Sequence, residues 1–160
     1  MTINLERDEH IIAGLPKVWV NELGFMGLLK KSREGILVLT NQKIIFVAKW
    51  FNVTPRERPK YFDKGEVRVT RIDGYSESEL DEDISDNPKT TIIPLESIVD
   101  VESAELRKVN FLRIKFRTDG KTKTYDFGLA KTMTSYPVRQ PLQYLDINWG
   151  PWIRLINAYM

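Results

Sequence analysis

Two runs of apolar, β-prone residues fold back on each other in the first third of the chain. The runs cover 35–40 and 43–47, and a polar Asn-Gln pair between them fits a two-residue turn. Such a turn places Leu37 opposite Phe46 on one face. We therefore predict a tight β-hairpin that turns this face toward the core.

The second face of the same hairpin is also apolar, whereas a sheet with one face in water alternates apolar and polar residues. Its residues are Ile36, Val38, Ile45 and Val47. We interpret these four as an interface for a partner protein or for a second copy of the chain. In the competing interpretation, a later segment with Trp50, Phe51 and Tyr61 folds over this face.

A second hairpin is predicted for residues 111–117 and 121–127, which are joined through an Asp-Gly turn. An Asp-Gly dipeptide suits a tight turn that needs positive φ. The alternation of apolar residues sets a register in which Arg113 lies opposite Asp126 on the outer face. We expect these two side chains to form a favourable pair of opposite charge.

The other elements are predicted from shorter patterns. Gly14 and Pro16 interrupt the early apolar residues, so we expect a short helix or turn there and a first strand near 27–31. Further short strands are expected within 65–72, 90–94 and 97–101. Asn148 can cap a terminal helix. The apolar stripe of that helix consists of Trp149, Trp152, Ile153, Ile156 and Met160.

Residues 51–89 differ in character from the rest of the chain, because basic residues there are followed by a dense acidic run. We interpret 51–89 as a charged, partly mobile insertion, with an acidic excursion at 74–88. Asp81, Asp83 and Ser85 have the alternate spacing of calcium ligands, but the glycine and the twelfth-position carboxylate of a calcium loop are missing. We therefore expect no metal and no cofactor.

Composition narrows the class of function. The chain has 160 residues, enough for one domain over 1–160, and a formal net charge of +2, which disfavours nucleic acid as a partner. It has one histidine and no cysteine, and no acid–base pair or nucleophile stands at a recognisable spacing. We expect a cytoplasmic protein without enzymatic activity. With neither signal peptide nor membrane span, any membrane contact would be peripheral.

The segments 35–46, 93–101 and 112–127, followed by the Trp-rich terminal helix, resemble the pleckstrin-homology-like (PH-like) superfamily, in its GRAM-like and prokaryotic branch. The resemblance implies a mainly β fold with a C-terminal α-helix. About seven antiparallel strands would form a two-sheet orthogonal β-sandwich, or partly open barrel, capped by that helix. The superfamily includes lipid-headgroup binders, peptide binders and structural modules, so the resemblance does not select one function.

The sequence therefore predicts an interaction module that binds a protein partner or forms a homo-oligomer. The alternative is peripheral binding to anionic membrane lipids, because cations precede the first hairpin where lipid-binding relatives often place them. The residues expected to contact the headgroup are Lys30, Lys31 and Arg33, with Lys43 as a helper.

Overall fold

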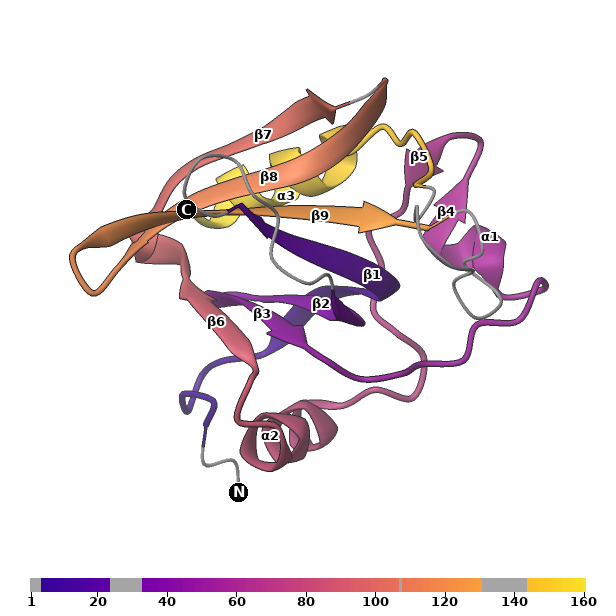
Figure 1. Cartoon of the computed structure of the whole chain (residues 1–160). Coiled ribbons are helices and arrows are strands. Elements are labelled where there is room, and N and C mark those ends of the chain that lie inside the picture. The colour runs from indigo at the N-terminus through magenta and orange to yellow at the C-terminus, as the bar shows by residue number, and fades with distance from the viewer. Residues whose placement is uncertain (1–3, 24–32, 107, 131–143) are drawn as a thin grey trace.

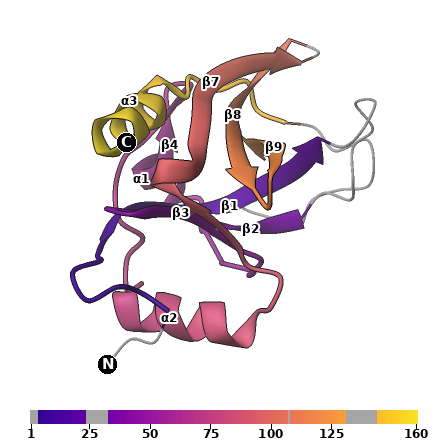
Figure 2. The ribbon, with the colours of Figure 1, turned by 90° about the vertical axis from the view of Figure 1, so that its left-hand side faces the viewer.

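The computed structural model describes residues 4–23, 33–106, 108–130 and 144–160. Seven antiparallel strands form one sheet in the order β6-β3-β2-β1-β9-β8-β7. The sheet folds over on itself, so that β7, β8 and β9 face the layer of β1, β2, β3 and β6 (Figures 1 and 2). Phe46 and Phe127 meet between the layers, with ring centroids 6.0 Å apart.

The strands of this sheet are β1 (Ile11–Leu23), β2 (Arg33–Thr40), β3 (Lys43–Val47), β6 (Thr91–Pro94), β7 (Ile98–Leu106), β8 (Val109–Thr118) and β9 (Lys121–Leu129). A second, two-stranded sheet consists of β4 (Phe62–Asp63) and β5 (Glu66–Val67). The helices are α1 (Arg58–Tyr61), α2 (Glu77–Asp86), the 3-10 helix η2 (Leu95–Ser97) and α3 (Gly150–Tyr159). This arrangement confirms a mainly β fold, a β-sandwich capped by a C-terminal helix.

Both predicted hairpins have the predicted register. Leu37 pairs with Phe46 in the first hairpin, and Arg113 pairs with Asp126 in the second. Asp119 and Gly120 both have positive φ, as a two-residue turn between twisted strands requires. Two parallel N–H···O contacts of 2.8 and 2.9 Å join the guanidinium of Arg113 to the carboxylate of Asp126.

The first strand differs from the prediction. Residues 11–23, read as a helix or turn, form β1, and the strand expected near 27–31 lies outside the described residues. Pro16 fits because the register shifts between Leu15 and Val18, where Lys17 takes a positive φ. Gly14 fits because a β-carbon there would lie 3.0 Å from the Ile72 side chain. Both apparent strand breakers therefore lie within a bulged strand.

The insertion 51–89 is folded in two parts. Its first part packs near α3, where the indole Nε1 of Trp152 donates to the Arg68 carbonyl and the backbone N–H of Val67 donates to the Asn148 carbonyl. Its second part contains α2, which begins after Ser76, whose hydroxyl accepts from the Glu79 N–H. Most of the acidic run, predicted as an excursion at 74–88, is thus a capped helix.

Helix α3 follows the predicted stripe. Trp149, Trp152 and Ile156 are fully buried, whereas Met160 at the end of the chain is half-exposed. The N-cap residue is Trp149 rather than the predicted Asn148, whose side chain one residue earlier accepts from the Gly150 N–H. The helix lies alongside β7 and β5 and fills the end of the sandwich (Figure 2).

Candidate functional site

The apolar outer face of the β2–β3 hairpin is not a free surface. Its four residues, Ile36, Val38, Ile45 and Val47, are at most 1% exposed. Helix α2 lies on this side of the sheet, opposite the layer of β8 and β9 (Figures 1 and 2). Leu80 of α2 and Ile72 before it are buried in the same apolar cluster. The structure corrects the assignment of this face as an interface, because the insertion already covers it.

Of the three residues predicted to cover this face, Phe51 is partly buried against the apolar cluster. Trp50 is 54% exposed, and the buried ring of Tyr61 belongs to the first part of the insertion, away from α2. Ile72, Tyr75 and Leu80 are buried instead. The competing interpretation, in which a later segment of the chain folds over this face, was therefore correct about the segment.

The four predicted lipid-binding cations do not form one described cluster. Lys30 and Lys31 lie outside the described residues. Arg33 and Lys43 lie at opposite ends of the hairpin, about 20 Å apart along an extended strand. The guanidinium of Arg33 donates to the Lys89 carbonyl at 3.1 Å and to the Thr91 hydroxyl at 3.4 Å. Lys43 cannot help Arg33 to bind a headgroup.

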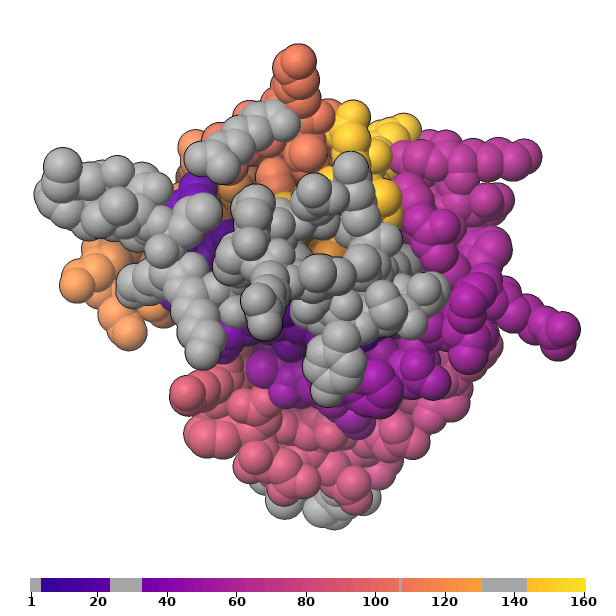
Figure 3. Space-filling view, turned by 45° about the vertical axis from the view of Figure 1, so that its right-hand side comes forward, coloured from indigo at the N-terminus to yellow at the C-terminus, as the bar shows by residue number. Residues whose placement is uncertain are grey.

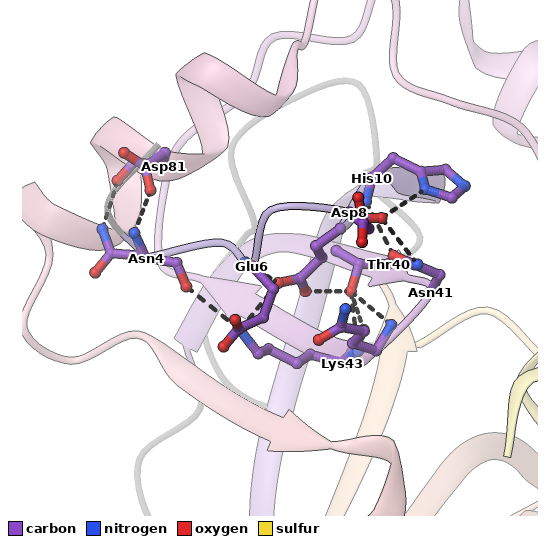
Figure 4. Close-up of polar contacts among 10 residues, drawn as sticks. Asn4, Glu6, Asp8, His10, Thr40, Asn41, Lys43 and Asp81 are labelled. Atoms are coloured by element: carbon purple, nitrogen blue, oxygen red, sulfur yellow. Dashed lines mark hydrogen bonds and ion pairs between the residues drawn. The ribbon is translucent and has the colours of Figure 1, made fainter. Parts of the chain in front are cut away.

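Lys43 belongs instead to a polar network around the hairpin turn (Figure 4). Its ammonium group lies 3.0 Å from Oε1 of Glu9, whose carboxylate also accepts from the Thr40 hydroxyl at 2.5 Å. The Thr40 hydroxyl in turn accepts from the backbone N–H of Gln42 and of Lys43. Glu9 and Thr40 are buried. The network therefore joins residues 4–10, called the N-terminal strap below, to the turn.

Three of the six acidic residues of α2, Glu77, Asp81 and Asp83, accept hydrogen bonds from other parts of the chain. The Asp83 carboxylate accepts from the Tyr75 hydroxyl at 2.6 Å and from Lys49 at 2.9 Å. Burial and the nearby Asp83 raise the pKa of Tyr75, so this phenol stays protonated. Hydrogen bonds from Arg71 lower the pKa of Glu77 to about 2, which keeps it a carboxylate at neutral pH. Asp81, Asp83 and Ser85, which have the spacing of calcium ligands, instead hold α2 against the rest of the chain.

The free edge of β7 is the first candidate site. Strand β7 ends the sheet order, and among the described residues its only strand partner is β8. Antiparallel ladders alternate bonded and non-bonded pairs, and Leu106 pairs with Val109 across the turn. The N–H groups of Ser103 and Glu105 therefore point away from β8. Such an edge can accept one more strand.

Apolar and acidic side chains border this edge. Val99 is 53% exposed at the register shift near the start of β7, and the C-terminal end of α3 lies beside that start in Figures 1 and 2. Tyr159 and Met160 are exposed at this end of α3. Glu102 and Glu105 follow along the strand. An added strand would thus meet an apolar border at one end and carboxylates at the other.

The tip of the β8–β9 hairpin is the second candidate site. Arg117, Lys121 and Lys123 are exposed there, and among the described residues none of them forms an ion pair. Figure 3 shows the tip, in orange, projecting from the left of the molecule. Leu23, the last residue of β1, pairs with Thr124, so the end of β1 lies beside these cations.

Arg33 lies at the same end of the molecule as the tip. Its positive charge acts on Tyr125 of β9, whose pKa is nevertheless raised because the phenol is buried. Sequence reasoning missed the cations of the tip because they lie on a different hairpin from Arg33. Their position in the sequence, on both sides of the predicted Asp-Gly turn, could have indicated this basic cluster.

No helix in the described part of the chain combines the length and apolar character that a membrane crossing requires.

No protein-family model and no curated protein matches the chain. Among solved structures, the chain is similar to the hSac2 domain from human phosphoinositide phosphatase Sac2, with 11% identity and a TM-score of 0.47. The match covers 97% of this chain and 72% of that chain. The expectation that the chain is not an enzyme is contradicted by this phosphatase neighbour and does not stand. The likeness itself assigns no activity to the chain.

Proposed function

We propose that the protein is an interaction module that binds an extended segment of a partner protein along the free edge of β7. The supporting observation is an edge strand of nine residues with outward N–H groups and no proline. In strand addition, main-chain hydrogen bonds supply affinity and the flanking side chains supply specificity. Glu102 and Glu105 favour a partner strand that carries Lys or Arg at one end, and Val99 favours an apolar residue at the other end.

We also propose that the module is PH-like, as the sequence resemblance implies. The seven-stranded sheet consists of two antiparallel meanders, β1-β2-β3-β6 and β7-β8-β9, and the first strand pairs with both the second and the last. The C-terminal helix fills one end. Strand order and helix position both support the proposal.

Substitution Ser103→Pro is expected to abolish strand addition while leaving the sheet intact. Proline removes the outward N–H of Ser103 and is tolerated on the free side of an edge strand. Each lost main-chain hydrogen bond costs about 1 kcal/mol, and the ring also keeps the added strand at a distance. We expect basic peptides selected from a phage-displayed random dodecapeptide library on the unmodified protein to bind the variant at least tenfold more weakly in fluorescence polarisation.

Ser103→Ala is the matched control, because alanine keeps the N–H and loses only the hydroxyl, whose contact with Asn110 is exposed. This variant should bind the selected peptides as the unmodified protein does. Equal peptide affinity of the proline and alanine variants would exclude the β7 edge. So would a selection that enriches no peptide above background.

The tip of the β8–β9 hairpin favours a second function, peripheral binding to anionic membranes. A basic side chain near an anionic surface contributes about 1 kcal/mol. The double substitution Lys121→Gln and Lys123→Gln is therefore expected to weaken sedimentation with phosphatidylserine vesicles about thirtyfold at low salt. Raising the salt concentration should weaken binding of the unmodified protein in the same assay.

The charge-matched control is Arg56→Gln with Lys64→Gln, because both residues are exposed in the first part of the insertion, at the other side of the molecule from the tip. If both double variants lose binding equally, the attraction comes from net charge and the tip is no site. Unmodified protein that stays in the supernatant at low salt would remove the membrane function altogether.

A further inference from the structure

Helix α2 and the N-terminal strap lie next to each other, and α2 covers the outer face of the β2–β3 hairpin (Figures 2 and 4). We propose that these two segments form one releasable cover, which opens as a unit and then exposes the apolar side chains of the hairpin. The closed form withholds that face from any partner. The proposal does not depend on binding at β7.

Helix α2 depends on docking for its helical structure. It has ten residues, and a helix of this length is unstable alone in water. It includes six carboxylates and no basic residue, so its charges repel one another. Within the helix, Leu80 is the fully buried apolar residue, and Ile84 is half-buried. When α2 leaves the sheet it should therefore also unwind.

The strap holds α2 from one side. The backbone N–H of Asn4 donates to the Asp81 carboxylate at 2.6 Å, and the Asn4 side-chain amide donates to the Asp81 carbonyl at 3.1 Å. The same amide donates to the Ser85 hydroxyl at 2.7 Å. Leu5, next in the strap, is buried in the main apolar cluster. One short segment thus contacts two successive turns of α2.

The strap is itself fixed to the hairpin turn. Its Glu9 binds Thr40 and Lys43, and its His10 N–H donates to the Asn41 side chain at 2.9 Å. The Lys43 ammonium also donates to the Asn4 carbonyl at 3.3 Å, which joins the two ends of the strap. Contacts therefore run without a gap from the turn through the strap to α2.

The other side-chain hydrogen bonds of α2 comprise the one from the Tyr75 hydroxyl to Asp83 and contacts with charged or backbone groups. Glu77 accepts from Arg71 and from the Ile11 N–H, and Asp83 accepts from Lys49. Half-exposed ion pairs of this kind exchange readily with water and contribute little net stability. Segments with few buried apolar contacts open locally before the whole molecule unfolds. The cover meets that description, whereas β8 and β9 lie in the core.

The test is hydrogen exchange measured by mass spectrometry on the full chain with Asn4→Ala. This substitution removes the two side-chain hydrogen bonds to α2 from a residue that is not buried. We expect amides of α2 and of the strap to exchange at least tenfold faster, with β8 and β9 unchanged. The fluorescence of the apolar dye anilinonaphthalene sulfonate should rise as the hairpin face becomes accessible.

Leu80→Ala tests the same coupling from the other end, because coupling between two segments is reciprocal. It should speed exchange in the strap as well as in α2. Ser78→Ala, an exposed position on the same helix, is the control and should change neither. Faster exchange confined to the mutated segment, equal acceleration of every strand, or no change in either variant would overturn the proposal.

Discussion

Trp152→Ala is expected to lower the free energy of unfolding by about 3–5 kcal/mol. The indole is fully buried, and it fills the space between the sheet and the first part of the insertion. Its removal leaves a cavity and also leaves the Arg68 carbonyl without its indole donor. Guanidinium denaturation followed by circular dichroism would measure the loss.

Trp50→Ala is the control, since it makes the same chemical change at an exposed indole. Its expected cost is about 1 kcal/mol or less, from the lost contact with the Lys17 ammonium 5.3 Å from the ring centroid. Comparable losses at the two tryptophans would contradict the position of α3 as a buried plug.

Gly35→Ala is expected to destabilise the protein by about 3 kcal/mol. A β-carbon at this position would overlap the Val47 carbonyl oxygen and would lie 2.8 Å from Cζ of Phe46. The obstacle is backbone of the neighbouring strand, which cannot move without breaking the β2–β3 ladder. The melting temperature and the denaturation midpoint should both fall.

Gly74→Ala separates this steric effect from the loss of glycine as such. Gly74 has a φ of 72° and open space around its Cα, so alanine there meets only the cost of a left-handed backbone, about 1 kcal/mol. If Gly35→Ala lowers the free energy of unfolding no more than Gly74→Ala does, then β2 and β3 do not approach each other closely at Gly35.

The two hairpins could be predicted from the sequence because their information is local. A two-residue turn and a period-two pattern together fix the register, and every residue between Leu112 and Thr118 pairs as the pattern requires. The terminal helix could be predicted equally well, because its apolar residues repeat at helical spacing.

The first strand and the cover could not be predicted, because they depend on distant contacts. Gly14 is needed in β1 only because Ile72 crosses it, and α2 is helical although its charges oppose a helix. The apolar pattern of the second hairpin face indicated that another segment or a partner must cover it, but it did not indicate which residues do so. The free edge of β7 follows from sheet order, which no local pattern encodes.

The placement of the insertion also affects the order in which the chain folds. Strands β3 and β6 are hydrogen-bonded neighbours, yet residues 48–90 lie between them. Closing a loop of this length costs about 2 kcal/mol more chain entropy than closing a four-residue link. The β2–β3 and β8–β9 hairpins close short loops and can form within microseconds. We therefore expect β6 to join the sheet after both hairpins have formed, because its pairing with β3 closes the longer loop.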